Sequence, residues 1–177
     1  MRLTVNGVEH DIASPPLTTL LDVLREELVV TSPKAGCQQG GCGACTVLVD
    51  GEPRRACLLP VAAVDGAEIV TAEGLGEPDE LSTVQAAFHE HYAAQCGFCT
   101  AGFVMATAAL AARSDGDVGR EEVIEALSGH VCRCTGYVKI VEAATAAVRG
   151  DASPARASAD TEPQGEDEVT LIPGSPA

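Results

Sequence analysis

The sequence has very few aromatic residues and few basic ones. Tryptophan is absent, aromatic residues make up only 3% of the 177 residues, and 11 Lys and Arg stand against 26 Asp and Glu, which gives a formal net charge of -15. A chain this acidic repels phosphate backbones and anionic membrane surfaces, so we expect no nucleic-acid binding. With few large rings available, the core has to be built mainly from Ala, Val, Leu and Ile, which suits helices that approach one another closely.

Long apolar stretches are absent as well. No run of about 20 apolar residues occurs, and the first ten residues, MRLTVNGVEH, contain neither an apolar signal-peptide core nor a twin-arginine pair. We therefore expect no membrane insertion and a cytoplasmic location. Because thiols stay reduced in the cytosol, the eight cysteines indicate metal binding rather than a disulfide framework.

Short alternating segments dominate the first part of the chain. Strand patterns lie at residues 2–6, 8–12, 46–49, 54–59 and 68–71. The Asn6-Gly7 pair between the first two strands is typical of a β-hairpin, and leucines at helical spacing predict a helix over residues 17–28. Residues 35–45 are rich in Gly and Cys without periodicity, so we expect an irregular loop there. This order predicts a small α+β domain, residues 1–75, in which one helix packs on a mixed sheet.

The pattern becomes helical beyond a linker at residues 72–79. Ser82 and Gln85 form a capping box in front of a helix that runs to about residue 94. Apolar residues at spacings of three and four predict further helices at residues 100–113, 120–128 and 137–148. We interpret residues 76–150 as a four-helix-bundle domain. Residues 151–177 are rich in Ser, Pro, Ala and acids, and we expect an acidic tail that is disordered or docked on a partner.

The first four cysteines have the plant-type spacing of [2Fe-2S] proteins. A Cys-x4-Cys-x2-Cys pattern is followed by one more cysteine, and the candidate metal ligands are Cys37, Cys42, Cys45 and Cys57. Glycines between them allow the loop to wrap closely and to aim backbone N–H groups at an anionic cluster. Zinc is disfavoured here, because a zinc site of this kind would need two pairs of cysteines at two-residue spacing.

The second four cysteines fall at two junctions between predicted helices. The candidate metal ligands are Cys96, Cys99, Cys132 and Cys134. Their four sulfurs can meet at one end of the helical domain, where helix N-termini favour an anionic cluster. Zinc stays open for this set taken alone, since a Cys-x-Cys pair also suits zinc. His89 and His91 point in different directions on one helix, whereas His130 is close enough to Cys132 to tune a cluster by contact.

Three stretches resemble the iron-sulfur small subunit of molybdenum hydroxylases, the xanthine oxidase and xanthine dehydrogenase family. They are GCQQGGCGACTVLVDG at residues 36–51, QCGFCTAGF at 95–103 and CRCTGY at 132–137, and the resemblance covers about residues 1–150. It implies an N-terminal β-grasp ferredoxin-like domain followed by a four-helix-bundle [2Fe-2S] domain. It also implies that the first cysteine set lies nearer a flavin and the second nearer molybdenum, with Gln95 and the Cys134 sulfur touching a pterin.

The implied function is electron transfer within a larger oxidoreductase. Electrons from molybdopterin, in its cytosine dinucleotide form on a large subunit, would pass through two [2Fe-2S] clusters to FAD on a medium subunit, in a dimer of heterotrimers. This chain would carry no substrate-converting site of its own. The alternatives are a free-standing two-cluster ferredoxin and a zinc-binding interaction module. Two positions depart from the family pattern: Ala101 stands where Pro is usual and His130 where Asn is usual.

Overall fold

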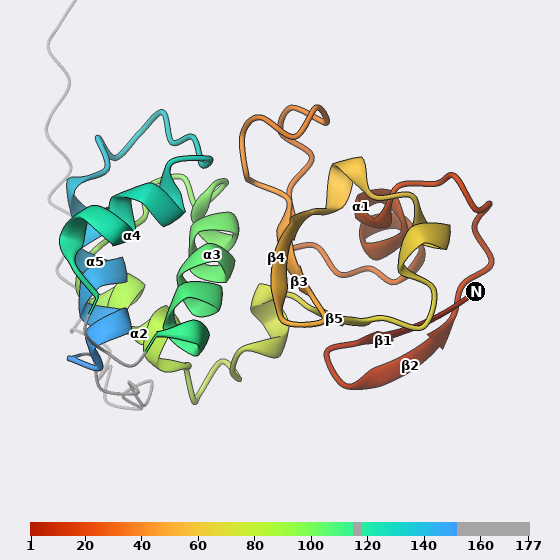
Figure 1. The fold of residues 1–177 in the computed structure, drawn as a ribbon, viewed down its shortest axis with the longest axis horizontal. Coiled ribbons are helices and arrows are strands. Elements are labelled where there is room, and N and C mark those ends of the chain that lie inside the picture. Colours follow the sequence, from red (N-terminus) through yellow and green to blue (C-terminus); the bar gives the residue numbers. More distant parts are fainter. Residues whose placement is uncertain (115–117, 152–177) are drawn as a thin grey trace, which may run out of the picture.

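The computed structural model describes residues 1–114 and 118–151, which form two lobes side by side (Figure 1). One lobe contains a sheet and a short helix, and the other contains α-helices. All eight cysteines lie in the described part of the chain. The predicted tail falls outside it, apart from Asp151.

The first lobe is built on a mixed five-stranded sheet. Its strands are β1 (Arg2–Val5), β2 (Val8–Asp11), β3 (Thr46–Val49), β4 (Glu52–Arg55) and β5 (Glu68–Val70). Their order is β2-β1-β5-β3-β4; β1 and β5 run parallel, and the other neighbours are antiparallel. The predicted hairpin around Asn6-Gly7 is confirmed, because both residues adopt the positive φ that such a turn requires.

The helix against this sheet begins later than the leucine pattern predicts. It consists of α1 (Leu20–Asp22) and one π-helical turn, η1 (Val23–Glu27). The Thr19 hydroxyl caps it by accepting a 3.1 Å hydrogen bond from the Asp22 N–H. Leu17 is 83% exposed and lies outside the helix, so the predicted start at residue 17 is wrong by three residues. The buried face of this helix carries Leu20, Leu21, Val23 and Leu24.

The predicted strand at residues 54–59 is also wrong in its bounds. Strand β4 ends at Arg55, and the chain turns at once into a 3-10 helix, η2 (Ala56–Leu58). The Ala56 N–H donates to the Cys45 carbonyl at 3.3 Å. This tight turn places Cys57 beside Cys45, which a continuing strand would not do. Two more 3-10 turns, η3 (Val61–Val64) and η4 (Ala72–Gly74), were not expected from the sequence.

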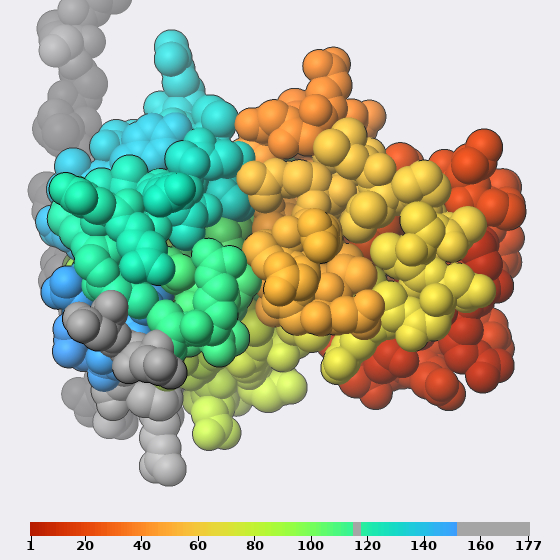
Figure 2. Space-filling view, in the orientation of Figure 1, coloured from red at the N-terminus to blue at the C-terminus, as the bar shows by residue number. Residues whose placement is uncertain are grey.

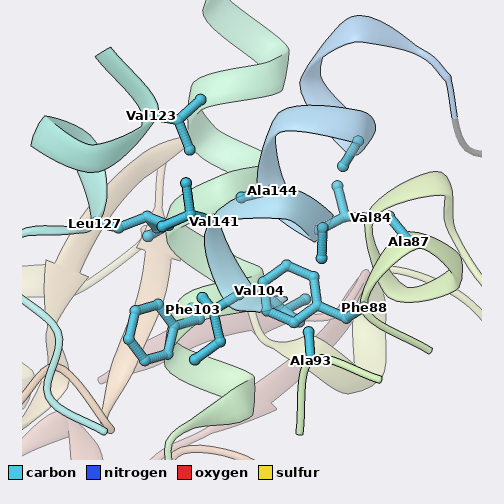
Figure 3. Close-up of a cluster of buried hydrophobic side chains, with 14 of the residues drawn as sticks. Val84, Ala87, Phe88, Ala93, Phe103, Val104, Val123, Leu127, Val141 and Ala144 are labelled. Carbon is cyan, nitrogen blue, oxygen red and sulfur yellow. The ribbon is translucent and has the colours of Figure 1, made fainter. Parts of the chain in front are cut away.

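The second lobe contains four α-helices around one core. They are α2 (Thr83–Glu90), α3 (Thr100–Arg113), α4 (Arg120–Leu127) and α5 (Val138–Arg149). The predicted capping box of α2 is confirmed, but that helix ends at Glu90 rather than near residue 94, because Tyr92 takes a left-handed φ of 52°. Figure 3 shows the core, where Phe88 and Phe103 are surrounded by Val, Leu and Ala side chains from all four helices. The small side chains allow the close helix approach expected from composition.

Helix α3 lies against β3 where the two lobes meet. The surfaces of the two lobes are in contact in Figure 2. A small apolar cluster of Leu48, Met105 and Ala109 is buried between them. Gly102 in α3 permits the closest approach: a Cβ there would collide with the carbonyl oxygen of Gly43 in the cysteine-rich loop. In the part of the chain that the structure describes, no helix is long and apolar enough to cross a membrane.

Candidate iron-sulfur sites

The first cysteine set is brought together at the end of the sheet lobe. Three of its members lie on the loop between η1 and β3, and Cys57 comes from the turn after β4. The thiols meet in two pairs. The Cys42 thiol influences the pKa of Cys37 and the Cys57 thiol that of Cys45, so the members of each pair are neighbours. The loop and the following hairpin therefore bring four cysteine sulfurs together as two neighbouring pairs.

Backbone N–H groups in the loop point at a cysteine sulfur, as the glycine-rich sequence predicts. The Gln39 N–H donates to the Cys37 sulfur at 3.4 Å. This bond, followed by the Cys42 thiol and the N–H groups of Cys42 and Gly41, lowers the pKa of Cys37 to about 7. Burial has the opposite effect on the other pair and raises the pKa of Cys45 to about 11. Cys37 therefore forms the thiolate that binds metal more readily than Cys45 does.

The second cysteine set lies at one end of the helical lobe. Cys96 and Cys99 occupy the junction before α3, with Cys99 as its N-cap, and Cys132 and Cys134 occupy the junction before α5. The sulfurs of Cys96 and Cys134 are 3.7 Å apart. The thiols of Cys99 and Cys132 influence each other's pKa, so they are neighbours as well. The predicted convergence at helix junctions is thus what the structure shows.

Local hydrogen bonds differentiate the thiols of the second set. Burial raises the pKa of Cys132, but the Thr135 hydroxyl, which donates to its sulfur at 3.2 Å, and nearby backbone N–H groups outweigh burial and lower that pKa to about 7. Burial, followed by the Cys132 thiol, raises the pKa of Cys99 to about 12. The neighbouring Cys96 raises the pKa of Cys134. Each set therefore contains one thiol that ionises near neutral pH.

The paired sulfurs fit a two-iron cluster. Two sulfurs bound to one tetrahedral metal at about 2.3 Å each lie about 3.8 Å apart, and the Cys96–Cys134 separation is 3.7 Å. A [2Fe-2S] cluster needs two such pairs, one for each iron. The second set shows this spacing for one pair, and in both sets neighbouring thiols influence one another's pKa in pairs. Within residues 1–114 and 118–151, no three His, Cys, Asp or Glu side chains are grouped so as to hold a single metal ion.

The two sets differ in their exposure. Cys45 and Cys57 are buried, whereas Cys96 and Cys134 are exposed, and so is Gln95 beside them. The side chain of Phe98, 48% exposed, lies between these surface cysteines and the first cysteine loop. The second set thus presents one edge at the molecular surface, where another molecule can approach within contact distance.

The predicted histidines lie in different environments. His89 is exposed and His91 is half-buried at the end of α2. His130 is 6% exposed, and burial together with the nearby Arg55 guanidinium lowers its pKa to about 4. Its Nε2 atom lies 3.0 Å from the Thr46 hydroxyl and 3.2 Å from Arg55 Nη1. His130 was expected near the second set, but its polar partners on the other lobe were not.

The two cysteine loops touch through their backbones. The Val131 N–H donates to the Cys42 carbonyl at 2.9 Å. One cavity of about 290 Å³ is lined by residues of both loops, among them Cys42, Phe98 and Cys132. No sequence signal predicted this contact, because its partners are far apart along the chain. It places the two candidate sites next to each other across the lobe boundary.

Comparisons with known proteins agree with this geometry. A family model described as "2Fe-2S iron-sulfur cluster binding domain" matches residues 3–72, and another described as "[2Fe-2S] binding domain" matches residues 71–145. The chain is 50% identical over 139 residues to the nicotine 6-hydroxylase small subunit of Paenarthrobacter nicotinovorans, covering 78% of this chain and 83% of that one. It is 42% identical to the nicotinate dehydrogenase small FeS subunit of Eubacterium barkeri, covering 84% and 94%.

Solved structures give the same result. The crystal structure of quinoline 2-oxidoreductase from Pseudomonas putida 86 matches with a TM-score of 0.78 and 44% identity, covering 85% of this chain and 94% of that one. The aldehyde oxidoreductase of Desulfovibrio gigas matches with a TM-score of 0.79 and 41% identity, but there the similarity covers only 17% of the longer chain. The same unit therefore occurs both as a separate small chain and as one part of a much longer polypeptide.

Proposed function

This chain belongs to the family of iron-sulfur subunits of molybdenum hydroxylases that includes xanthine dehydrogenase, and from that membership we propose that it transfers electrons inside a multi-subunit oxidoreductase. The proposed route leads from a molybdopterin centre on a large subunit to FAD on a medium subunit. The observation that carries it is the pairing of eight free thiols in two adjacent sets. Substrate conversion would take place on a partner chain.

We assign the two lobes to two domains. The separate hydrophobic cores support a boundary near residue 75, with a β-grasp ferredoxin-like domain before it and a four-helix bundle after it. One core consists of residues from Leu3 to Ile69, and the other of residues from Val84 to Val148. The two matched families meet at residues 71–72, close to the same place. The acidic tail, residues 151–177, lies outside the described residues apart from Asp151.

The residues that would hold the clusters are the two sets described above. One [2Fe-2S] cluster would be bound by Cys37, Cys42, Cys45 and Cys57, and the other by Cys96, Cys99, Cys132 and Cys134. Each cluster, when bound, supplies a centre that accepts and donates one electron. The chain's own part is to fix the sulfurs, to donate N–H and O–H groups to them, and to exclude water from the buried members.

The exposed edge of the second set supports its assignment to the molybdenum side. Gln95 and Cys134 lie at the surface, where their polar atoms can contact a pterin held by the large subunit. We propose that the large subunit holds molybdopterin in its cytosine dinucleotide form and that the medium subunit binds FAD. The complete enzyme would be a dimer of heterotrimers. We place the assembly in the cytoplasm, where the eight thiols stay reduced until they take up iron.

The experiment is a purification from the native host under anaerobic conditions through a tag on the full chain. We expect a red-brown complex with about four iron per chain and two further subunits that carry molybdopterin and FAD. Replacing Cys45 or Cys99 by Ser should each remove one of two distinct EPR signals from the reduced complex. A colourless chain that contains zinc would refute the cluster assignment, and a red-brown chain without partners would identify a free-standing ferredoxin instead.

A further inference from the structure

A buried polar contact joins the two lobes between the two candidate cluster sites. Its members are His130 in the loop before the second cysteine pair, and Thr46 and Arg55 on neighbouring strands of the sheet. We propose that these three residues, called here the polar joint, are positioning residues that fix the distance and orientation between the two clusters. This proposal rests on the proposed function, because the two clusters whose distance it concerns are the ones required for electron transfer.

The polar joint is tied to both lobes by directed hydrogen bonds. The Arg55 guanidinium donates through Nη1 to the Thr46 hydroxyl and through Nη2 to the Gly129 carbonyl at 2.8 Å. The Thr46 hydroxyl in turn donates to the Gly43 carbonyl at 2.6 Å, inside the first cysteine loop. His130 Nε2 faces both Thr46 and Arg55. A planar guanidinium that bonds both lobes at once restrains rotation as well as separation.

Packing also ties the imidazole to both lobes. The ring lies 5.2 Å from the Phe103 ring, centroid to centroid, and covers Gly43, where a Cβ would stand only 2.7 Å from His130 Cγ. Gly43 has a φ of 75°, and its neighbour Cys42 accepts the hydrogen bond from Val131. The residues before and after His130 are therefore bonded to the first lobe as well. A shift of either cysteine loop would have to break this contact first.

Outside the polar joint, directed contacts across the lobe boundary include the Val131–Cys42 backbone bond and a 2.9 Å bond from Gln85 Nε2 to the Ala72 carbonyl. The apolar cluster of Leu48, Met105 and Ala109 is small, and hydrophobic contact is non-directional. Interfaces between domains within one chain permit relative motion unless they are large and hydrophobic. Hydrogen bonds depend on angle as well as distance. Between the two cysteine loops, the polar joint is the side-chain cluster that bonds both lobes, so we assign to it the fine orientation of the loops and to the apolar cluster the adhesion of the lobes.

The consequence for function follows from the steep fall of electron tunnelling with distance. The first cluster would belong to one lobe and the second to the other, so a small relative movement changes the gap between them. Cys42 lies directly beside the joint on one side, and Cys132 lies two residues from His130 on the other. A rigid joint holds the gap at one value, whereas a loosened joint produces a spread of gaps.

The test measures the magnetic interaction between the two clusters in the reduced holoenzyme, from the splitting and relaxation of their EPR signals. Two variants remove the joint, His130→Ala and Arg55→Met, and His130→Gln keeps a polar group near the place of Nε2. Matched controls are His89→Ala, an exposed histidine, and Arg54→Met, the exposed neighbour of Arg55 on β4. The iron content of every variant is measured alongside.

We expect the two disruptive variants to keep full iron and both EPR signals while the magnetic interaction is broadened or lost. His130→Gln should retain it, and both controls should match the wild type. An interaction unchanged in both His130→Ala and Arg55→Met would overturn the proposal. So would a loss of iron from one set in those variants, because the joint would then act on cluster binding alone. A wild-type complex without two clusters would instead contradict the proposed function.

Discussion

Alanine substitutions at three glycines separate backbone strain from steric contact at the lobe boundary. Gly43 and Gly51 have nearly the same left-handed φ, 75° and 83°, but only Gly43 has neighbours within 4 Å of an added Cβ. Gly102 is the reverse case, a helical glycine whose Cβ would meet the Gly43 backbone. The three positions therefore test conformation plus contact, conformation alone, and contact alone.

The magnitudes follow from these differences. A left-handed φ costs a residue with a Cβ about 1–2 kcal/mol, and that is the full loss expected for Gly51→Ala. Gly43→Ala adds a collision with the His130 ring and with the Gly129 carbonyl, 2.9 Å away. Overpacking of this kind costs about 1–3 kcal/mol, so the total loss is about 2–5 kcal/mol. For Gly102→Ala, overpacking opposes a helix-propensity gain of about 1 kcal/mol.

The assay is thermal unfolding of the full chain with its clusters, read by far-UV circular dichroism. With about 2–4 °C for each kcal/mol at this chain length, Gly43→Ala should lower the melting temperature by roughly 4–20 °C. Gly51→Ala should lower it by roughly 2–8 °C, and Gly102→Ala should be destabilising despite its better helix propensity. The reasoning fails if Gly43→Ala is no worse than Gly51→Ala, or if Gly102→Ala stabilises the chain.

Three further substitutions test contacts elsewhere. Thr135→Val removes the hydroxyl that donates to the Cys132 sulfur. Because donors to ligand sulfurs favour the more negative reduced state, the reduction potential of one EPR-defined cluster should fall by on the order of tens of millivolts. A potential unchanged in redox titration would contradict this. Tyr137→Phe leaves the Cys132 N–H without the hydroxyl oxygen that accepts its 2.9 Å hydrogen bond. The free energy of unfolding, measured with denaturant, should fall by about 1–2 kcal/mol. An unchanged free energy would show that another acceptor replaces the hydroxyl. The pKa of Glu73 is raised by burial but lowered further by hydrogen bonds, first from Ser32, so its folded pKa lies below the unfolded value of 4.5. The carboxylate therefore stabilises the chain above that value and loses its effect as the pH falls through the folded pKa. Glu73→Gln should lower the free energy of unfolding by about 1–2 kcal/mol at pH 7, discounted for partial exposure, and the difference should vanish in acid. A difference in unfolding free energy that is independent of pH would refute the assignment.

Local sequence patterns predicted the elements better than their ends. The Asn6-Gly7 turn and the capping box of α2 are fixed by neighbouring residues, so sequence reasoning identified them. Leu17 fits the leucine spacing but lies outside the helix, because the Thr19 cap begins it later. The predicted strand over residues 54–59 was wrong because the chain turns after Arg55 and brings Cys57 beside Cys45. This contact between separate segments is not encoded in the β propensity of the residues.

The candidate sites also combine features that the sequence predicts with features that only the fold reveals. Cysteine spacing alone predicted two sets, and the structure brings the sulfurs of each set together. The polar joint could not be predicted. Its contacts bring His130 Nε2 to Thr46 and Arg55 over 84 and 75 residues of sequence, and neither partner belongs to a recognisable motif. Only the folded chain shows why a histidine at this position is buried between the two lobes.

The uneven exposure of the two cysteine sets has a consequence for the life of the subunit before assembly. Oxygen and peroxide attack accessible thiolate sulfur first. Cys96 and Cys134 are open to solvent in the isolated chain, while Cys45 and Cys57 are shielded by protein. Damage by air would therefore reach the exposed Cys96 and Cys134, and the half-exposed Cys37 with its lowered pKa, before it reaches Cys45 and Cys57. For the newly made chain, early docking of a partner over that exposed edge is a form of protection as well as a step of assembly.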